Sequence, residues 1–90
     1  MVNNNLYGTI RMHQQRRHPG KVSGTELWNP IFASYAEAFD SYGEVVRTTD
    51  EFAPAFERAR ASGKPAVLEL QIDPECICYG MPELSQLPPI

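Results

Sequence analysis

Three consecutive asparagines, Asn3, Asn4 and Asn5, are the residues near the start of the chain that are best suited to chemistry. They follow the apolar pair Met1-Val2 and precede a segment with the residue spacing of a helix. Asparagine side chains cap the free N–H groups of a helix start, and their amide oxygens are neutral hard donors that Mg²⁺ and Ca²⁺ accept. A helix N-terminus carries partial positive charge, so it also favours a bound anion. These features predict one half of a metal–phosphate site, and the other half is absent from the sequence.

The segments around the asparagines resemble a known cofactor-binding motif. Val2-Asn3-Asn4 and Tyr7-Gly8-Thr9-Ile10-Arg11 resemble the second half of the thiamine-diphosphate motif, with the closest likeness to the acetolactate-synthase-like enzymes. Further matching segments extend the likeness over residues 2–75: Pro19-Gly20, Val22-Ser23-Gly24-Thr25, Asn29-Pro30, Phe32, Phe52-Ala53-Pro54-Ala55-Phe56, Ser62-Gly63-Lys64-Pro65-Ala66 and Ile72-Asp73-Pro74-Glu75. The resemblance implies thiamine diphosphate and Mg²⁺ as cofactors of the intact enzyme and 2-oxo acids as its substrates, with the cofactor as the electron sink.

The resemblance also assigns roles by position. It implies cofactor contacts for Asn4, Leu6, Tyr7 and Gly8, and weaker substrate-pocket positions for Thr9, Ile10 and His13. Asn4 would be the side-chain metal ligand and Leu6 the carbonyl ligand. No catalytic residue is implied, because the family's Gly-Asp-Gly segment and its catalytic glutamate are not in this sequence. The residue types leave two alternatives open: Asn4 as an ordinary helix cap, and His13 as a partly exposed helical histidine.

Three functional interpretations follow from this incomplete motif. The first is a C-terminal fragment of a thiamine-diphosphate-dependent, acetolactate-synthase-like enzyme that is not catalytic by itself, with the cofactor bound weakly or not at all. The second is a homo-oligomeric interaction module that kept the fold and lost the chemistry. The third is one chain of a split enzyme, active only with a partner chain that carries the Gly-Asp-Gly half.

Periodicity and turn residues predict an α/β fold, a partial three-layer parallel sheet with helices on its faces. The expected order is a strand stump, helix, helix, strand, helix, strand and an irregular tail. Asn4 or Asn5 is expected to cap the first helix, and Asn29 the second, which Gly43 should end. The expected strands are residues 2–3, 44–48 and 66–72, the first helix ends at Arg17, and the third helix runs from residue 48–50 to Gly63. We expect a core of large residues: Trp28, Phe32, Phe39, Phe52 and Phe56 against Val45, Leu68 and Leu70.

Residues 1–75 are expected to form a partial cofactor-binding domain and residues 76–90 an irregular tail. A small parallel sheet with an open edge is a template for association. We therefore expect a homo-oligomer through that edge, or pairing with a chain that carries the missing domains.

Composition excludes several other classes of function. No apolar run approaches the roughly 20 residues that span a bilayer, and no basic-then-apolar leader is present. The four basic residues of the first 25 positions lack the aromatic interleaving of a nucleic-acid surface, and all 11 acids lie farther along the chain. Cys76 and Cys78 are too few for a structural zinc site and are expected to be reduced thiols of a cytoplasmic protein.

Overall fold

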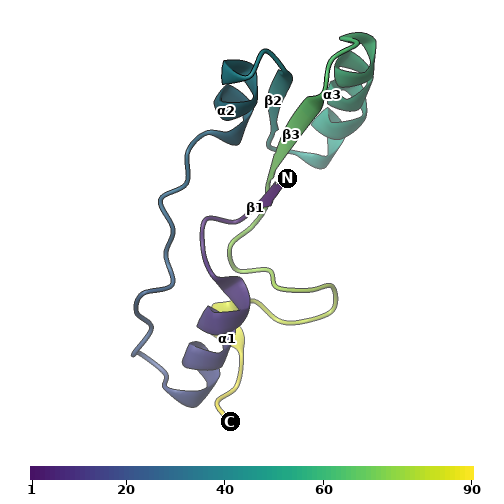
Figure 1. The fold of residues 1–90 in the computed structure, drawn as a ribbon. Helices are drawn as coiled ribbons and strands as arrows, with labels where there is room; N and C mark the ends of the chain where they lie inside the picture. The colour runs from purple at the N-terminus through teal and green to yellow at the C-terminus, as the bar shows by residue number, and fades with distance from the viewer. The chain divides into compact units, whose positions relative to one another are not determined.

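The computed structural model describes residues 1–90 and has an α/β fold with a three-stranded parallel sheet (Figure 1). Its elements are β1 (Val2–Asn3), α1 (Gly8–Arg17), α2 (Phe32–Ala38), β2 (Tyr42–Val46), α3 (Thr49–Ala61), β3 (Ala66–Gln71) and a short 3-10 helix η1 (Leu84–Gln86). The predicted fold class and order of elements are confirmed. No helix has both the length and the apolar content to cross a membrane.

The chain divides into two compact units. The first, the sheet unit, contains Met1–Asn3 and Asn29–Ile72, and therefore all three strands with α2 and α3. The second, the α1 unit, contains Asn4–Trp28 and Asp73–Ile90, and therefore α1 and η1. The predicted division into residues 1–75 and 76–90 stays a prediction.

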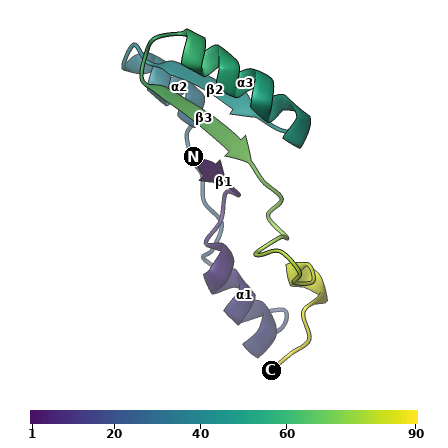
Figure 2. The same cartoon turned by 90° about the vertical axis from the view of Figure 1, so that its right-hand side faces the viewer.

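The sheet has the strand order β1-β3-β2, and both pairs are parallel. Helices α2 and α3 lie on opposite faces of it, which Figures 1 and 2 show from two sides. Paired residues point to the same face of a sheet and neighbours along a strand to opposite faces. The register pairs Gly43 with Val67 and Val45 with Glu69, which places these four residues on the α2 face.

Helix α3 is stabilised by charged residues at its two ends and by two small residues that it buries. Asp50 and Glu51 lie in its first turn and Arg58 in its last, so each charge opposes the helix dipole at its own end. Ala55 and Ala59, four residues apart, are its buried residues. Arg58 also bonds the Glu44 carboxylate of β2 at 2.6 Å, which holds the pKa of that carboxyl below its usual range.

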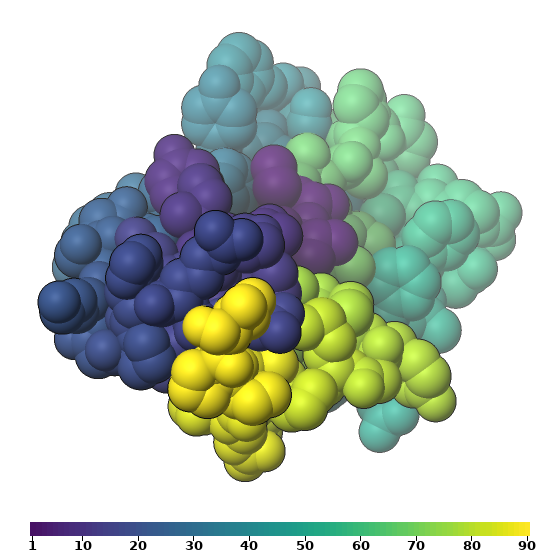
Figure 3. Space-filling model, turned by 90° about the horizontal axis from the view of Figure 1, so that it is seen from below, coloured from purple at the N-terminus to yellow at the C-terminus, as the bar shows by residue number.

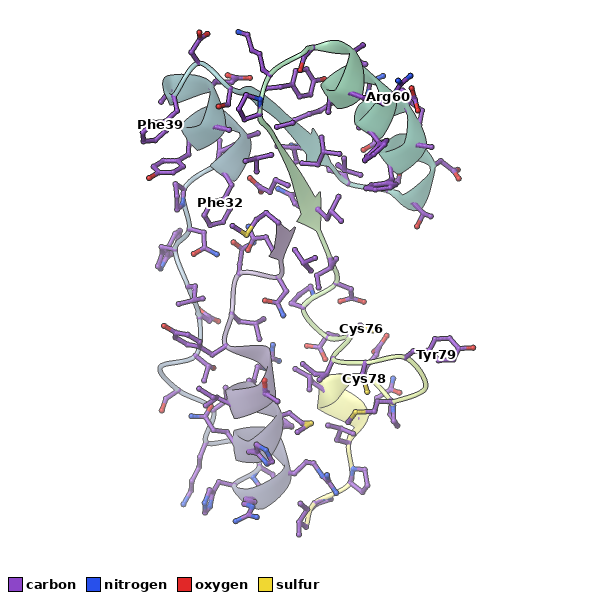
Figure 4. All side chains as sticks on the ribbon, turned by 45° about the vertical axis from the view of Figure 1, so that its right-hand side comes forward. Phe32, Phe39, Arg60, Cys76, Cys78 and Tyr79 are labelled. Atoms are coloured by element: carbon purple, nitrogen blue, oxygen red, sulfur yellow. The ribbon has the colours of Figure 1, made fainter.

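The predicted core of large side chains is wrong for Trp28, Phe39, Phe52 and Phe56, which are exposed, whereas Phe32, Val45, Leu68 and Leu70 are half-buried. The buried apolar residues of the sheet unit are instead Ala33, Ala36, Val46, Ala55 and Ala59. Trp28 is 99% exposed, Phe39 69%, Phe56 51% and Phe52 42%, and Figure 4 shows Phe39 on the outer side of α2. The residues that the two helices bury are alanines, and α2 approaches the sheet closely where the Ala33 backbone meets Gly43.

Three predicted helix boundaries are also wrong. Helix α1 begins at Gly8 with Tyr7 as its N-cap, not with Asn4 or Asn5, because Asn5 adopts a left-handed turn conformation (φ 60°). Helix α2 begins at Phe32, two residues later than expected. Gly43 is a residue of β2 and does not end a helix.

In the α1 unit the C-terminal segment packs against α1. The backbone N–H of Ile90 donates to the Arg16 carbonyl at 2.9 Å, and Leu84 of η1 is fully buried. Figure 3 shows the yellow C-terminal atoms lying against the dark blue atoms of α1. Apart from η1, the tail is irregular, as predicted.

Candidate functional site

The predicted cofactor residues form a turn that leads into α1. The Leu6 N–H donates to the side-chain oxygen Oδ1 of Asn4 at 3.3 Å. Asn5 between them takes the left-handed conformation, which asparagine tolerates better than most residues. The Asn4 side chain is therefore held at the start of this turn and does not cap the helix, because α1 has no side-chain cap.

An antiparallel bridge between Leu6 and Glu26 fixes this turn from outside. The Tyr7 N–H donates to the Thr25 carbonyl, and the Leu27 N–H donates to the Asn5 carbonyl, both at 2.8 Å. In such a pair the backbone groups of the two bridged residues point away from each other. The Leu6 carbonyl accepts none of the backbone hydrogen bonds of this turn, and its oxygen is of the type that a hard cation binds.

The start of α1 is open to an anion. Its first intrahelical bond runs from the Arg11 N–H to the Tyr7 carbonyl at 2.9 Å. The N–H groups of Gly8, Thr9 and Ile10 therefore have no acceptor within the helix, and no acidic residue lies in the first turn. These groups and the helix dipole favour a bound phosphate.

Two side chains lie close to Gly8. A Cβ at this position would lie 3.1 Å from Nδ2 of Asn4 and 2.9 Å from Cδ1 of Ile77. The absent side chain lets the Asn4 amide lie directly beside the helix start. That Gly8 allows close approach of a diphosphate, as the resemblance implies, stays a prediction.

Arg11 does not face a ligand with a free charge. Its guanidinium bonds the Glu75 carboxylate at 3.0 Å, and the second oxygen of Glu75 accepts the Ser85 N–H at 2.9 Å. The Ser85 backbone hydrogen bond is the main reason that the pKa of Glu75 lies below its usual range, with Arg11 adding to it. This half-buried ion pair links the segment that contains Glu75 to α1.

The structure places Asn4, Leu6, Tyr7 and Gly8 together within five residues of turn and helix start. Thr9, Ile10 and His13 follow on α1 and are all exposed, with Ile10 at 53%. Thr9 and His13 are four residues apart and share one side of the helix. Which of these seven residues contact a ligand stays a prediction.

The donor set of this turn fits half of a metal–diphosphate site. It offers two neutral oxygens, Asn4 Oδ1 and the Leu6 carbonyl, beside a helix start with unpaired N–H groups. Hard cations such as Mg²⁺ bind such oxygens together with phosphate. No group of three or more His, Cys, Asp or Glu side chains converges here or elsewhere in the chain. A charged ligand for such a cation is therefore not among the residues of this turn.

The sheet unit contains a buried carboxylate, that of Glu69, which the sequence analysis did not single out. Glu69 of β3 is 2% exposed, and its Oε1 accepts the N–H groups of Phe32 and Ala33, at 2.6 and 3.3 Å, at the start of α2. Gln71 donates to its other oxygen at 3.4 Å. The signal was a charged residue in the middle of an apolar central strand, where parallel sheets are buried on both faces.

Burial acts to raise the pKa of the Glu69 carboxyl. Hydrogen bonds from Gln71, from the Phe32 and Ala33 backbone and from Asn3 outweigh it and hold that pKa below its usual range. Asn3 in turn accepts a hydrogen bond from the Asn29 side chain at 3.0 Å. Asn3, the first of the three asparagines, therefore makes hydrogen bonds that stabilise the sheet unit.

Two comparisons with known proteins concern the cofactor of this chain. Residues 1–70 match the family described as "Thiamine pyrophosphate enzyme, C-terminal TPP binding domain". The chain is also 34% identical over 86 residues to the "Putative thiamine pyrophosphate-containing protein YdaP" of Bacillus subtilis (strain 168). That alignment covers 89% of this chain but only 15% of the relative, so the chain spans a small part of the relative's length.

Proposed function

Since this chain belongs to the thiamine pyrophosphate enzyme family through its C-terminal TPP-binding domain, we propose that it is the C-terminal part of an acetolactate-synthase-like enzyme that uses thiamine diphosphate and Mg²⁺. The intact enzyme would act on 2-oxo acids. By itself the chain is not catalytic, because it contains one half of the cofactor site and no Gly-Asp-Gly segment. The whole activity requires the missing half, supplied by the same polypeptide or by a partner chain.

The observation that carries this proposal is the turn from Asn4 to Gly8. Asn4 Oδ1 and the Leu6 carbonyl are the atoms that would hold the cation. The N–H groups of Gly8 and the next two residues would hold the diphosphate, with Tyr7 at its side. When bound, the cofactor supplies an electron sink for 2-oxo acid chemistry.

The residues of α1 have a different proposed role. Thr9, Ile10 and His13 would line the substrate side of the site, and their exposure in this chain is consistent with a surface that another part of the enzyme covers. Ile10 supplies an apolar contact and His13 a polar one. They position a substrate and do not transfer its protons in this proposal.

Titration of the purified chain with thiamine diphosphate and Mg²⁺ tests the half-site. We expect weak, Mg²⁺-dependent binding by calorimetry, accompanied by a higher unfolding temperature, because a ligand of the folded state stabilises it. Asn4→Ala should weaken binding at least about tenfold, a loss of roughly 1.4 kcal/mol. Asn4→Asp should restore metal-dependent binding, because a carboxylate is a better Mg²⁺ ligand than an amide.

Gln15→Ala, which removes an amide from the far part of α1, is the control and should bind like the unchanged chain. Absence of binding at millimolar cofactor would reject cofactor binding by this chain alone. Turnover of pyruvate by the chain alone, lost in Asn4→Ala, would reject the statement that it is not catalytic.

The second candidate function is a homo-oligomeric interaction module, and the open edge of β1 favours it. The Met1 carbonyl accepts the N–H of Leu70 in β3 at 2.7 Å, and the Asn3 carbonyl accepts the N–H of Ile72, just after β3, at 3.0 Å. Alternate residues of a parallel strand bond to opposite sides, so the N–H and carbonyl of Val2 between them face the open edge. Val2 is 63% exposed. We propose that a second copy, or a chain with the missing strands, pairs here. A cytoplasmic location is part of this proposal.

Val2→Pro tests pairing at this edge. Proline lacks the N–H that a neighbouring strand would need, but it leaves the bonds from β1 to β3 in place, as edge strands allow. We expect self-association to weaken about fivefold to tenfold, the effect of one lost backbone hydrogen bond of about 1–1.5 kcal/mol. Sedimentation velocity over a range of concentrations measures it. Val2→Thr, which keeps the N–H and the strand propensity, should associate normally. A chain that is monomeric at all concentrations would contradict this candidate.

A further inference from the structure

Three sulfur-containing residues lie within six positions of the loop that follows β3. They are Cys76, Cys78 and Met81, and both cysteines are exposed and reduced. The proposed cofactor site uses none of them. Figure 4 shows the two cysteines and Tyr79 on this loop, with Tyr79 extending away from the chain. Two thiols and a thioether so close together in the sequence invite the question of what they bind.

Two hydrogen-bonded turns shape the backbone of this loop. A turn from Asp73 ends at Cys76, whose N–H donates to the Asp73 carbonyl at 3.2 Å. A second turn begins at Cys78 and ends at Met81, whose N–H donates to the Cys78 carbonyl at 3.2 Å. The ends of such a turn lie within about 7 Å of each other. The loop thus consists of two consecutive turns joined at Ile77, with sulfur residues on both sides of the joint.

Ile77 fixes the side of the loop on which the thiols lie. Its Cδ1 packs over Gly8, where an added Cβ would be 2.9 Å away. Ile77 is only half-exposed, whereas Cys76 and Cys78 on either side of it are exposed. The anchored isoleucine therefore holds both thiols toward solvent.

The spacing suits a shared metal ion better than a disulfide. Residues i and i+2 of an extended link have Cα atoms about 6.6 Å apart, which is near the upper limit for a disulfide. Two thiolates at this spacing can reach one ion through metal–sulfur bonds of about 2.3 Å. The nearest carboxylate, that of Glu75, is already occupied by Arg11 and by the Ser85 N–H.

The ligand types select the metal. Thiolates and thioethers are soft ligands that prefer monovalent copper over Mg²⁺, Ca²⁺ or Mn²⁺. A structural zinc site would need four ligands, and no group of three His, Cys, Asp or Glu side chains exists in the chain. We propose that Cys76, Cys78 and Met81 form a binding site for one monovalent copper ion. On binding, each thiol releases its proton to solvent and two copper–thiolate bonds form, with the Met81 sulfur as a third, neutral ligand. No electron is transferred.

Competition with bicinchoninate, a chelator that changes colour when it binds copper(I), tests the proposal. The experiment is done in the absence of oxygen and in the presence of a reductant. The chain should withdraw one equivalent of copper from the chelator. Cys76→Ser and Cys78→Ser should each lower the apparent affinity at least about 100-fold, because a hydroxyl is a poor ligand for a soft ion. Met81→Leu should lower it about threefold to tenfold, in line with a weaker thioether ligand. Circular dichroism shows whether each variant is folded; the two exposed cysteines should tolerate substitution well, and Met81, which is half-buried, is replaced by a side chain of similar size.

Met12→Leu is the matched control, because it removes a thioether from α1 and should leave copper binding unchanged. The proposal is overturned if the chelator keeps all the copper, if either single serine variant binds as the unchanged chain does, or if Met12→Leu weakens binding as much as Met81→Leu. Copper bound at one ion per two chains would also overturn it, in favour of a site shared between copies. Asn4→Ala should bind copper normally, so failure of the thiamine diphosphate proposal and failure of this one are distinguishable.

Discussion

Gly43→Ala is expected to destabilise the sheet unit by about 3 kcal/mol, the upper part of the usual cost of overpacking a core. A Cβ at Gly43 would collide with the carbonyl oxygen of Ala33 and lie 2.7 Å from its carbonyl carbon and 2.9 Å from its Cα. All three are backbone atoms of α2, so no rotation of a side chain can relieve the contact. The whole helix would have to move away from the sheet. Denaturant unfolding followed by circular dichroism measures the loss.

Gly63→Ala is the control for this substitution. Gly63 has a positive φ of 68° and no atom within 4 Å of an added Cβ. Its replacement should cost only the left-handed conformation, about 1–2 kcal/mol. If the two variants are equally stable, the close approach of α2 to β2 is not the reason that position 43 is glycine.

Glu69→Ala is expected to cost about 3 kcal/mol, the range for removing an ionised acceptor from buried donors. The substitution leaves the N–H groups of Phe32 and Ala33 without their acceptor at a helix start that has no side-chain cap of its own. It also removes an acceptor from Gln71. Glu57→Ala, which breaks an exposed ion pair of α3 with Arg60, should change stability by no more than about 0.5 kcal/mol. Equal effects of the two variants would contradict the role assigned to the buried carboxylate.

The same carboxylate makes stability depend on pH. The pKa of Glu69 is lower in the folded chain than its usual value. Its contribution is therefore fully present above the unfolded-state pKa of about 4.3 and is lost as the pH falls through the lower folded-state pKa. Glu69→Gln should unfold with a shallower acid transition than the unchanged chain. An identical pH profile would show that other groups control the acid transition.

Family, fold class and element order could be predicted from the sequence because each depends on local patterns. The segment from Val2 to Arg11 and the glycine and proline positions are short motifs, and strand–helix–strand succession dictates parallel pairing. The confirmed strand Ala66–Gln71 had both β-rich composition and clear end signals. Only its last residue was misplaced.

The core and the support of α2 could not be predicted, because they depend on distances between elements. Aromatic residues on one helical stripe normally indicate the buried side, yet Tyr35 and Phe39 are exposed and pack edge-to-face on each other at 5.2 Å. The controlling feature is the contact of Gly43 with Ala33, which brings α2 too close to the sheet for rings. The spacing of apolar residues along the sequence gives no information on the distance between α2 and the sheet. Gly43 was therefore interpreted as a helix end, and Glu69 was not singled out at all.

The exposure of Trp28 determines which optical signals can follow this chain. It is the single tryptophan and is 99% exposed, so its indole is surrounded by water in the folded and in the unfolded chain alike. Its fluorescence should therefore change little on unfolding, and the free energy of unfolding has to be measured by circular dichroism of the backbone. For the same reason it is a sensitive reporter of association. Any molecule that covers this indole moves it from water into an apolar environment, and the emission shifts to shorter wavelength against a nearly constant background.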